Sequence, residues 1–404
     1  MSTSTGVQFL DVLDPGFDFG STEVRLAQDR NWYADSPIGI IVLRYAEAQE
    51  LLRDQRLNHN SERYLEMNGV VDGPIYDWFV PMIVSHDGEH HRRLRGLVNK
   101  AFTPRMISNL RPFIRAQAEQ LADRLESADE IDFVRDFADK LPLAVMCELL
   151  GVPAEDYADF RVWTSDIGLV FGIALGEDIR QRVEAAVVGL NGYVDSLLEA
   201  KRADPGDDLI SALLAIQRTD ESRVSLAELQ NLIVTLVFAA HDTTRHQLAN
   251  AMATFAEYPE QWAALGRQPE LADQAVEEVM RWNPSSTTLY RFAAEDFDYR
   301  DLHLTTGTFL SIGVAIAQRD SRVFHNGHTF DITVQREAPP LQFGGGPHHC
   351  LGSALARAEL SEALPVLAPR LGPPTITGPV TWRPAIGIRG PYQLPLRFAT
   401  PRQH

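Results

Sequence analysis

The sequence has few cysteines, no long apolar run and no excess of positive charge. Its 404 residues include only two cysteines, Cys147 and Cys350, far apart in the chain. This excludes a disulfide framework and predicts a reducing compartment, the cytoplasm. The longest apolar stretch, Leu232 to Ala240, is too short to cross a bilayer, and the N-terminus lacks the basic start and apolar core of a signal peptide. We therefore expect no association with a membrane.

The charge balance argues against nucleic acid as a partner. The chain carries 37 Lys and Arg against 55 Asp and Glu, a net charge of −18. Nothing in this balance attracts phosphate to the molecule as a whole. A local basic surface remains compatible with it.

The pattern of the chain predicts one mainly α-helical domain over residues 1–404, with a minor β part. There is no internal repeat or low-complexity linker, and proline and glycine are spread throughout. The β-branched segment 38–45 predicts a strand, and helical spacing dominates from about 90 to 280. After residue 290 the chain turns to short strands and loops, with one more helix starting near Leu351.

Two helices can be predicted in more detail. One face of the first carries apolar residues at helical spacing: Leu110, Ile114, Ala118, Leu121 and Leu125. The second begins after Ser225, which can cap it, with Glu228 completing a capping box. The stretch 232–240 is apolar on nearly every side, so we expect this helix to be central and buried.

Cys350 lies in a glycine-rich segment, 343–352, directly after two histidines. Glycines let the backbone approach a flat ligand and adopt positive φ, and a helix start favours a thiolate. Four interpretations follow: a nucleophile with His348 or His349 as base, a zinc site, an axial thiolate of haem iron, or a buried structural cysteine. No second CxxC or spaced histidine pair completes a zinc site. A structural cysteine leaves the surrounding glycines and histidines unexplained.

The segment resembles the haem-binding signature of the cytochrome P450 family at a series of positions: Phe343, Gly344, Gly346, His348, Cys350 and Gly352, followed by Leu355, Ala356 and Arg357. The resemblance extends over about residues 30–395 and is to the soluble bacterial branch. It implies the cytochrome P450 fold, a bound haem b (iron protoporphyrin IX) contacted by Phe343 and Gly344, and Cys350 as the axial ligand of the iron. The implied enzyme is a monooxygenase that uses O2 to hydroxylate or epoxidise a small apolar molecule in bacterial secondary metabolism or catabolism.

Asp242 and Thr243 lie inside the predicted central helix, where an acid is costly unless it is paired or serves a purpose. Without context they fit a salt-bridged Asp and a Thr bonded back to its own helix. Beside the thiolate signature they resemble the family's acid–alcohol pair, in which Asp242 would relay protons and Thr243 would hold water near the bound dioxygen. The resemblance also implies a local widening of this helix. The family usually has glycine where this chain has Ala240.

Glu278 and Arg281 are three apart on a predicted helix, close enough to pair. An exposed pair of this kind contributes little to stability. By resemblance they are the family's Glu-x-x-Arg pair, which braces the cysteine loop, with Arg336 as the third member. The segment 330–343 is one residue longer than the family usually has.

Cationic side chains match the family's contacts to the haem propionates. His91 and Arg95 are four apart on a helix that begins near Asp87, and without the resemblance they would form a solvated basic face. Arg291 and His348 match two further contacts. The planar donors of arginine suit carboxylates.

The same helix and its continuation carry further basic residues: Arg92, Arg93, Lys100, Arg105, Arg111 and Arg115. They form either a solvated face or, by resemblance, the docking surface for an acidic electron donor, a ferredoxin or flavodoxin with its own reductase. The chain shows no dinucleotide-binding glycine motif after a strand, so another protein would oxidise NAD(P)H.

By resemblance, the substrate pocket is formed by segments 60–85, 160–180, 232–243, 284–290 and 385–391. Aromatic residues in the first two segments predict a fairly large, apolar substrate. A relative that acts only as a binding module is the alternative class. Such a relative would usually have lost the cysteine, the threonine or the propionate ligands, all of which this chain retains.

Overall fold

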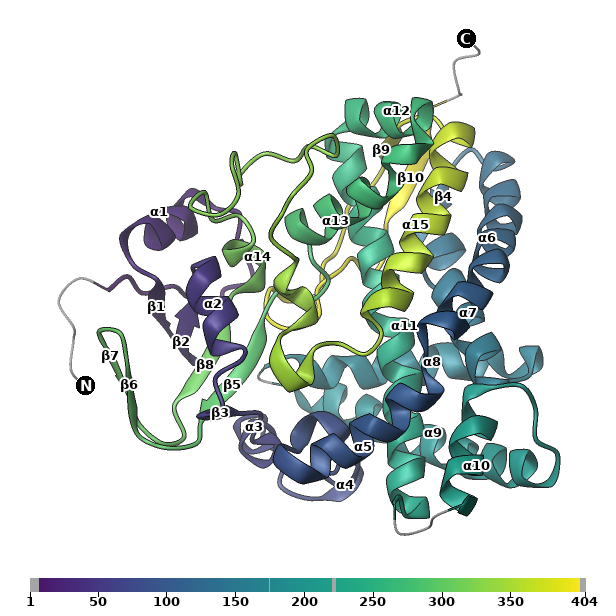
Figure 1. Cartoon of the computed structure of the whole chain (residues 1–404). Helices are drawn as coiled ribbons and strands as arrows, with labels where there is room; N and C mark the ends of the chain where they lie inside the picture. Colours follow the sequence, from purple (N-terminus) through teal and green to yellow (C-terminus); the bar gives the residue numbers. More distant parts are fainter. Residues whose placement is uncertain (1–6, 174, 220–222, 400–404) are drawn as a thin grey trace.

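The computed structural model describes residues 7–173, 175–219 and 223–399, and α-helices dominate it. The α-helices are α1 Thr22–Arg30, α2 Tyr45–Leu51, α3 Ser61–Met67, α4 Gly73–Phe79, α5 Gly88–Ala101, α6 Pro104–Glu126, α7 Lys140–Leu150, α8 Tyr157–Ile167, α9 Glu177–Ala203, α10 Leu209–Thr219, α11 Leu226–Glu257, α12 Pro259–Arg267, α13 Ala272–Trp282, α14 Val314–Ala317 and α15 Ser353–Arg370. Most of them form a helical body on one side of Figure 1, and the largest sheet lies on the other side together with α1, α2 and α14. The prediction of a mainly α protein with a minor β part is confirmed.

The strands are short and form three sheets. They are β1 Tyr33–Ser36, β2 Gly39–Val42, β3 Leu57–Asn58, β4 Ile131–Asp132, β5 Leu289–Ala293, β6 Phe297–Tyr299, β7 Leu302–Leu304, β8 Phe309–Ile312, β9 Pro374–Ile376 and β10 Pro395–Phe398. The largest sheet has the order β1-β2-β8-β5-β3, in which only β2 and β8 run parallel. Antiparallel pairing places Arg291 of β5 opposite Leu310 of β8, which fixes the position of that arginine.

Helix α11 is the central helix, as predicted. Ser225 and Glu228 form the expected capping box at its start, and most of its residues are buried. The predicted widening is absent: α11 runs as an uninterrupted α-helix through Ala240, and the one π-helical segment among the described residues is Val134–Ala138. The methyl group of alanine favours continuous helix where glycine would weaken it.

Helix α15 packs along α6 on one flank of the body (Figure 1). The predicted apolar face of α6 is buried, from Leu110 to Leu125. Because the cysteine loop directly precedes α15, this packing fixes the position of Cys350 beneath α11.

One predicted boundary was wrong, and a second lies close to the one observed. The strand expected over 38–45 ends at Val42, and Tyr45 already belongs to helix α2. The reason is tertiary: a carboxylate oxygen of Asp320 accepts a hydrogen bond from the Tyr45 backbone N–H at 3.2 Å, so it caps the new helix. Helix α15 starts at Ser353, two residues after the expected position, because Cys350 and Leu351 still belong to the loop.

None of the helices in the described part of the chain is both long and apolar enough to cross a membrane.

Candidate active site

The cysteine loop is held by its own backbone. Gly344 and Gly346 adopt φ of +68° and +62°, a conformation that favours glycine, and the N–H of Cys350 donates to the carbonyl of Phe343 at 2.8 Å. The guanidinium of Arg357, one turn into α15, lies over the Phe343 ring at 4.5 Å. These contacts return the chain to Phe343 and present the thiol at one place.

The Cys350 thiol opens onto cavity space beneath α11. It lines two neighbouring cavities together with Thr243 and Thr244, and the larger of the two encloses about 690 Å³. Cys350 is exposed to this space, but the protein that surrounds it raises the pKa of the thiol, and the backbone N–H groups of Gly352 and Ser353, with the charges of Arg95 and Arg357, oppose only part of that effect. The helix start alone therefore does not produce the expected thiolate. A bound cation such as iron would supply the missing stabilisation.

A further cavity of about 860 Å³ adjoins this space on the other side of Thr243. Its apolar and aromatic lining comes from the predicted segments and β8: Tyr64, Val84, Phe171, Ile173, Phe238, Ala239, Leu289, Tyr290, Phe309, Ile386 and Ile388. Two other aromatic residues of segment 60–85, Trp78 and Phe79, do not line it and are buried in the packing of α4.

Four predicted propionate contacts gather around one corner. Arg291 is buried at the edge of the 860 Å³ cavity, and burial lowers its pKa to about 10. The rings of His91 and His348 lie 4.3 Å apart, and His348 hydrogen-bonds through Nε2 to Asp87 at 2.8 Å. Arg95 donates to the carbonyl of His349 at 2.7 Å. The geometry thus brings the cysteine loop, α5 and β5 together.

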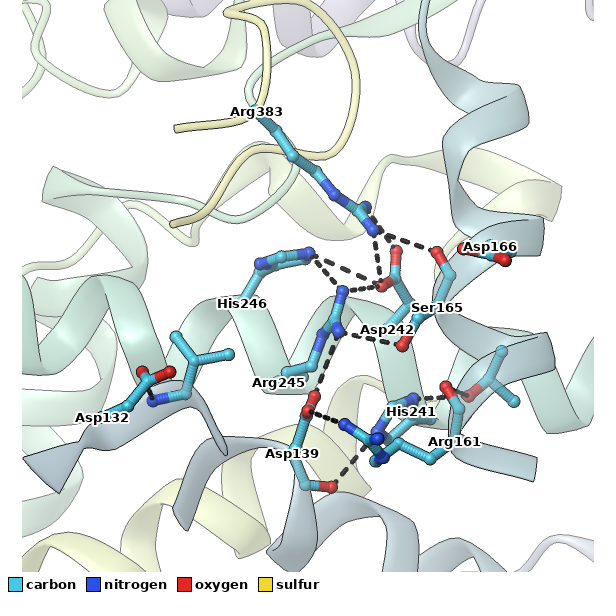
Figure 2. A network of polar contacts seen from close by, with 12 residues as sticks. Asp132, Asp139, Arg161, Ser165, Asp166, His241, Asp242, Arg245, His246 and Arg383 are labelled. Carbon is cyan, nitrogen blue, oxygen red and sulfur yellow. Dashed lines mark hydrogen bonds and ion pairs between the residues drawn. The ribbon is translucent and has the colours of Figure 1, made fainter. Parts of the chain in front are cut away.

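Asp242 points away from the cavities into a buried ionic network, shown in Figure 2. Its carboxylate accepts hydrogen bonds from Arg245 at 2.8 Å and from Arg383 at 2.8 and 3.2 Å. Burial alone would raise the pKa of Asp242, but the charges of Arg383 and Arg245 hold it well below its ordinary value. Thr243, the next residue, lines the cavities instead, and its hydroxyl donates to the carbonyl of Ala239 at 3.2 Å.

The network extends from α11 to α8 and to the start of α7. Arg245 also donates to Asp139 at 3.0 Å and to the Ser165 hydroxyl at 2.9 Å, and Arg383 donates to the Ser165 carbonyl at 3.1 Å. His241 contacts Asp139 and α8 from the same helix. The sequence could have suggested Arg245, three residues after Asp242 on one helix. Nothing local pointed to Arg383.

Comparison with known proteins identifies the family. The cytochrome P450 family model matches residues 166–367. The luteothin monooxygenase of Streptomyces thioluteus is 45% identical over 391 residues, which cover 96% of each chain. The chain belongs to the cytochrome P450 family. The cytochrome P450 PikC of Streptomyces venezuelae is 35% identical over 80% of this chain and 77% of its own. The solved bacillaene polyketide synthase cytochrome P450 PksS of Bacillus subtilis 168 superposes with a TM-score of 0.84 at 29% identity, over 96% of this chain and 99% of that one.

As a cytochrome P450, the protein is a monooxygenase whose cofactor is haem b. The residues present fit that group. Arg291 is buried, and neither it nor Arg95 has a carboxylate within ion-pair distance among the described residues, because the nearby Asp87 is bonded to His348. The Cys350 thiol, by contrast, needs a nearby cation to stabilise its thiolate form. No group of three or more His, Cys, Asp and Glu side chains is placed to hold a metal ion within the described ranges, so the zinc hypothesis lacks a ligand set.

Two buried residues near the P450 site were missed from the sequence. His59, directly after β3, lines the 860 Å³ cavity and contacts Arg291. Glu359 of α15 lines the 690 Å³ cavity together with Thr243 and Cys350. Burial raises the pKa of Glu359 well above its ordinary value, and its Oε2 atom has no partner within the described structure. No local pattern distinguishes either residue, because only the tertiary fold brings it to a cavity.

The Glu278 carboxylate is fully buried and shared by two arginines. Arg281 donates to both of its oxygens at 2.7 Å, and Arg336 donates at 3.0 and 3.1 Å. Arg281 also donates to the carbonyls of Gln318 and Gly327. This geometry ties α13 to the segment leading to the cysteine loop.

The basic surface is smaller than the sequence suggested. Arg93 pairs with Glu228, and Arg111 and Arg115 both pair with Glu362. Of the six further basic residues predicted for this surface, Arg92, Lys100 and Arg105 are exposed and have no ion pair with another described residue.

Proposed function

We propose that this cytochrome P450 hydroxylates or epoxidises an apolar small molecule of bacterial secondary metabolism, in the cytoplasm, as a single domain over residues 1–404. The observation that carries the proposal is the joint placement of Cys350 and Thr243 on the cavities beneath α11. Relatives named for polyketide biosynthesis and as luteothin monooxygenase support the substrate class. The apolar and aromatic lining of the cavity on the other side of Thr243 favours an apolar substrate.

Each predicted site residue has a role in this proposal. The thiolate of Cys350 would ligate the haem iron, with Phe343 and Gly344 beside the macrocycle, and His91, Arg95, Arg291 and His348 would hold the propionates. Bound haem supplies the activation of dioxygen and the insertion of one oxygen atom. Glu278, Arg281 and Arg336 would keep the cysteine loop in place.

Thr243 and Asp242 have separate roles in proton transfer. The Thr243 hydroxyl faces the cavities and would hold a proton at Oγ1, or bind a water there. Asp242 is paired with two arginines, so it would deliver protons only after the Arg383 contact opens. Because Arg383 also donates to the Ser165 carbonyl of α8, a movement of α8 would accompany proton delivery from Asp242.

Electrons would come from a ferredoxin or flavodoxin that docks on the cations of α5 and the start of α6. Charge steering accelerates such encounters and weakens with salt. We expect Arg92→Glu and Lys100→Glu to lower the second-order rate of reduction by an acidic ferredoxin at low salt. Arg30→Glu at the end of α1 is the matched control, because Arg30 is likewise exposed and has no ion pair among the described residues. Equal rates in all three variants would exclude this docking surface.

The cofactor assignment has a direct spectroscopic test. The reduced protein with carbon monoxide should show the strongly red-shifted Soret band of thiolate ligation. Cys350→Ala should abolish that band. Cys147→Ala should retain it, because Cys147 is a buried core thiol of α7. A band that survives in Cys350→Ala would refute the assignment of the axial ligand.

A further inference from the structure

His59 is a buried side chain between the propionate corner and the cavity. It follows β3, is only 6% exposed, and its ring lies 4.5 Å from that of His348 and 5.7 Å from that of Tyr290. Its Nε2 atom lies 2.8 Å from Nη1 of Arg291. The residue is therefore fixed on three sides by groups of the corner.

The contact with Arg291 determines which nitrogen of His59 carries the proton. A guanidinium has only donors, so Nε2 of His59 must accept the hydrogen bond. Burial, followed by the charges of Arg291, His348 and His91, lowers the pKa of His59 well below its ordinary value, so the ring is neutral. A neutral imidazole whose Nε2 accepts has its single N–H at Nδ1.

This N–H has no acceptor within the protein. The Nδ1 atom is buried and has no hydrogen-bond partner among the described residues, although His59 lines the cavity. A buried donor without an acceptor is costly and is rare in native proteins. The Nδ1–H of His59 therefore needs an acceptor oxygen from a bound group.

The surroundings indicate which oxygen that is. Neither Arg291 nor Arg95 has a carboxylate at ion-pair distance in the described structure, and the nearby Asp87 is bonded to His348. Arg291 and the Nδ1–H of His59 thus belong to adjoining side chains without an anionic acceptor, while the nearby acid is already engaged. A carboxylate of a bound group would satisfy both, and charge-assisted hydrogen bonds of this kind are the strong ones.

We propose that His59 is a further anchor of the haem, whose Nδ1–H donates to a propionate carboxylate while Nε2 orients Arg291. The proposal rests on the haem-thiolate function above. It assigns a residue that lies outside the Cys350 loop, α5 and β5, the elements of the four predicted contacts.

Two substitutions separate the roles of the two ring nitrogens. In His59→Asn the amide nitrogen occupies the position of Nδ1, so the donor remains and the acceptor for Arg291 is lost. In His59→Gln the amide oxygen reaches the position of Nε2, so the acceptor remains and the donor is lost. The measurement is the rate of haem transfer from the ferric protein to excess apomyoglobin. We expect His59→Gln to lose haem about tenfold faster than the wild type, and His59→Asn to lose it markedly more slowly than His59→Gln.

The reverse order would show that His59 only orients Arg291, and equal rates in all proteins would show no role in anchoring. Either result overturns the proposal. The carbon monoxide band of each variant is recorded in parallel. Its presence with wild-type haem loss refutes the His59 proposal alone, whereas its absence in the wild type refutes the proposed function.

Discussion

The Oδ2 atom of Asp242 lies 2.8 Å from Nη1 of Arg383, although the two residues are 141 positions apart. Both are almost completely buried. The same arginine reaches the backbone of α8, so one ionic contact joins the central helix, the C-terminal segment and α8 (Figure 2). The acid predicted to relay protons is thereby part of the packing of the molecule.

Asp242→Asn should destabilise the protein by about 3–5 kcal/mol, because it leaves Arg383 buried without a carboxylate. Arg245 is affected less, because it keeps its ion pair with Asp139. The double variant Asp242→Asn with Arg383→Met should be less destabilised than the sum of the two single variants, because an apolar side chain needs no partner. Urea unfolding of the four proteins measures this coupling. Additive effects would show that the two residues do not depend on each other.

The space around Asp242 gives a second prediction. A Cβ atom at Gly168 would lie 2.1 Å from Oδ2 of Asp242, so Gly168→Ala must displace the carboxylate. We expect a loss of about 1–3 kcal/mol in unfolding free energy. Gly192→Ala in α9 is the control: a Cβ there meets nothing within 4 Å, and alanine favours helix, so stability should rise by up to about 1 kcal/mol. Equal effects of the two substitutions would contradict the observed packing.

The buried histidines of α11 predict acid sensitivity. Burial lowers the pKa of His241 to about 4, against about 6.5 in the unfolded chain. Between these values the unfolded chain binds the proton and the folded protein does not. Stability is therefore complete above about pH 6.5 and is lost as the pH falls to about 4, by about 3 kcal/mol for this residue. His241→Gln should reduce the slope of unfolding free energy against pH near 5.5 by about 1.4 kcal/mol per pH unit. An unchanged slope would show that His241 titrates normally in the folded protein.

How well a feature can be predicted from the sequence depends on how far apart in the chain the interacting residues lie. The turn at Gly344 and Gly346, the cap at Ser225 and the apolar face of α6 depend on neighbouring residues, and local patterns indicate them. The glycine-rich segment also indicated a ligand site at Cys350, and the structure places its thiol on a cavity. The thiolate expected from the helix start is opposed by the surrounding protein, which raises the pKa of the thiol and which no local pattern reveals.

Contacts between residues far apart in the chain could not be predicted from the sequence. His59 and Arg291 are 232 positions apart, and Asp320 caps the start of α2 from 275 positions away. Neither pairing leaves a periodic trace, because each side needs only one residue of the right type. The size of the basic surface was overestimated for the same reason. Arg111 and Arg115 are both paired with Glu362 of α15, which is far from them in the chain.

Thr243 lies between the cavities, whereas the side chain of its neighbour Asp242 belongs to the ionic network. Substitutions at the two residues should therefore have different effects. Thr243→Ala removes a hydroxyl that hydrogen-bonds only to its own helix among the described residues. We expect stability within about 1 kcal/mol of the wild type. If the hydroxyl holds the proton or water in the reaction, electron consumption should continue while the share that appears in product falls several-fold. Thr243→Ser should restore coupling, because it restores the hydroxyl. The measurement is the ratio of product to NAD(P)H consumed, with hydrogen peroxide quantified in parallel. Normal coupling in Thr243→Ala would shift the role to Thr244, which lines the cavity beside Cys350.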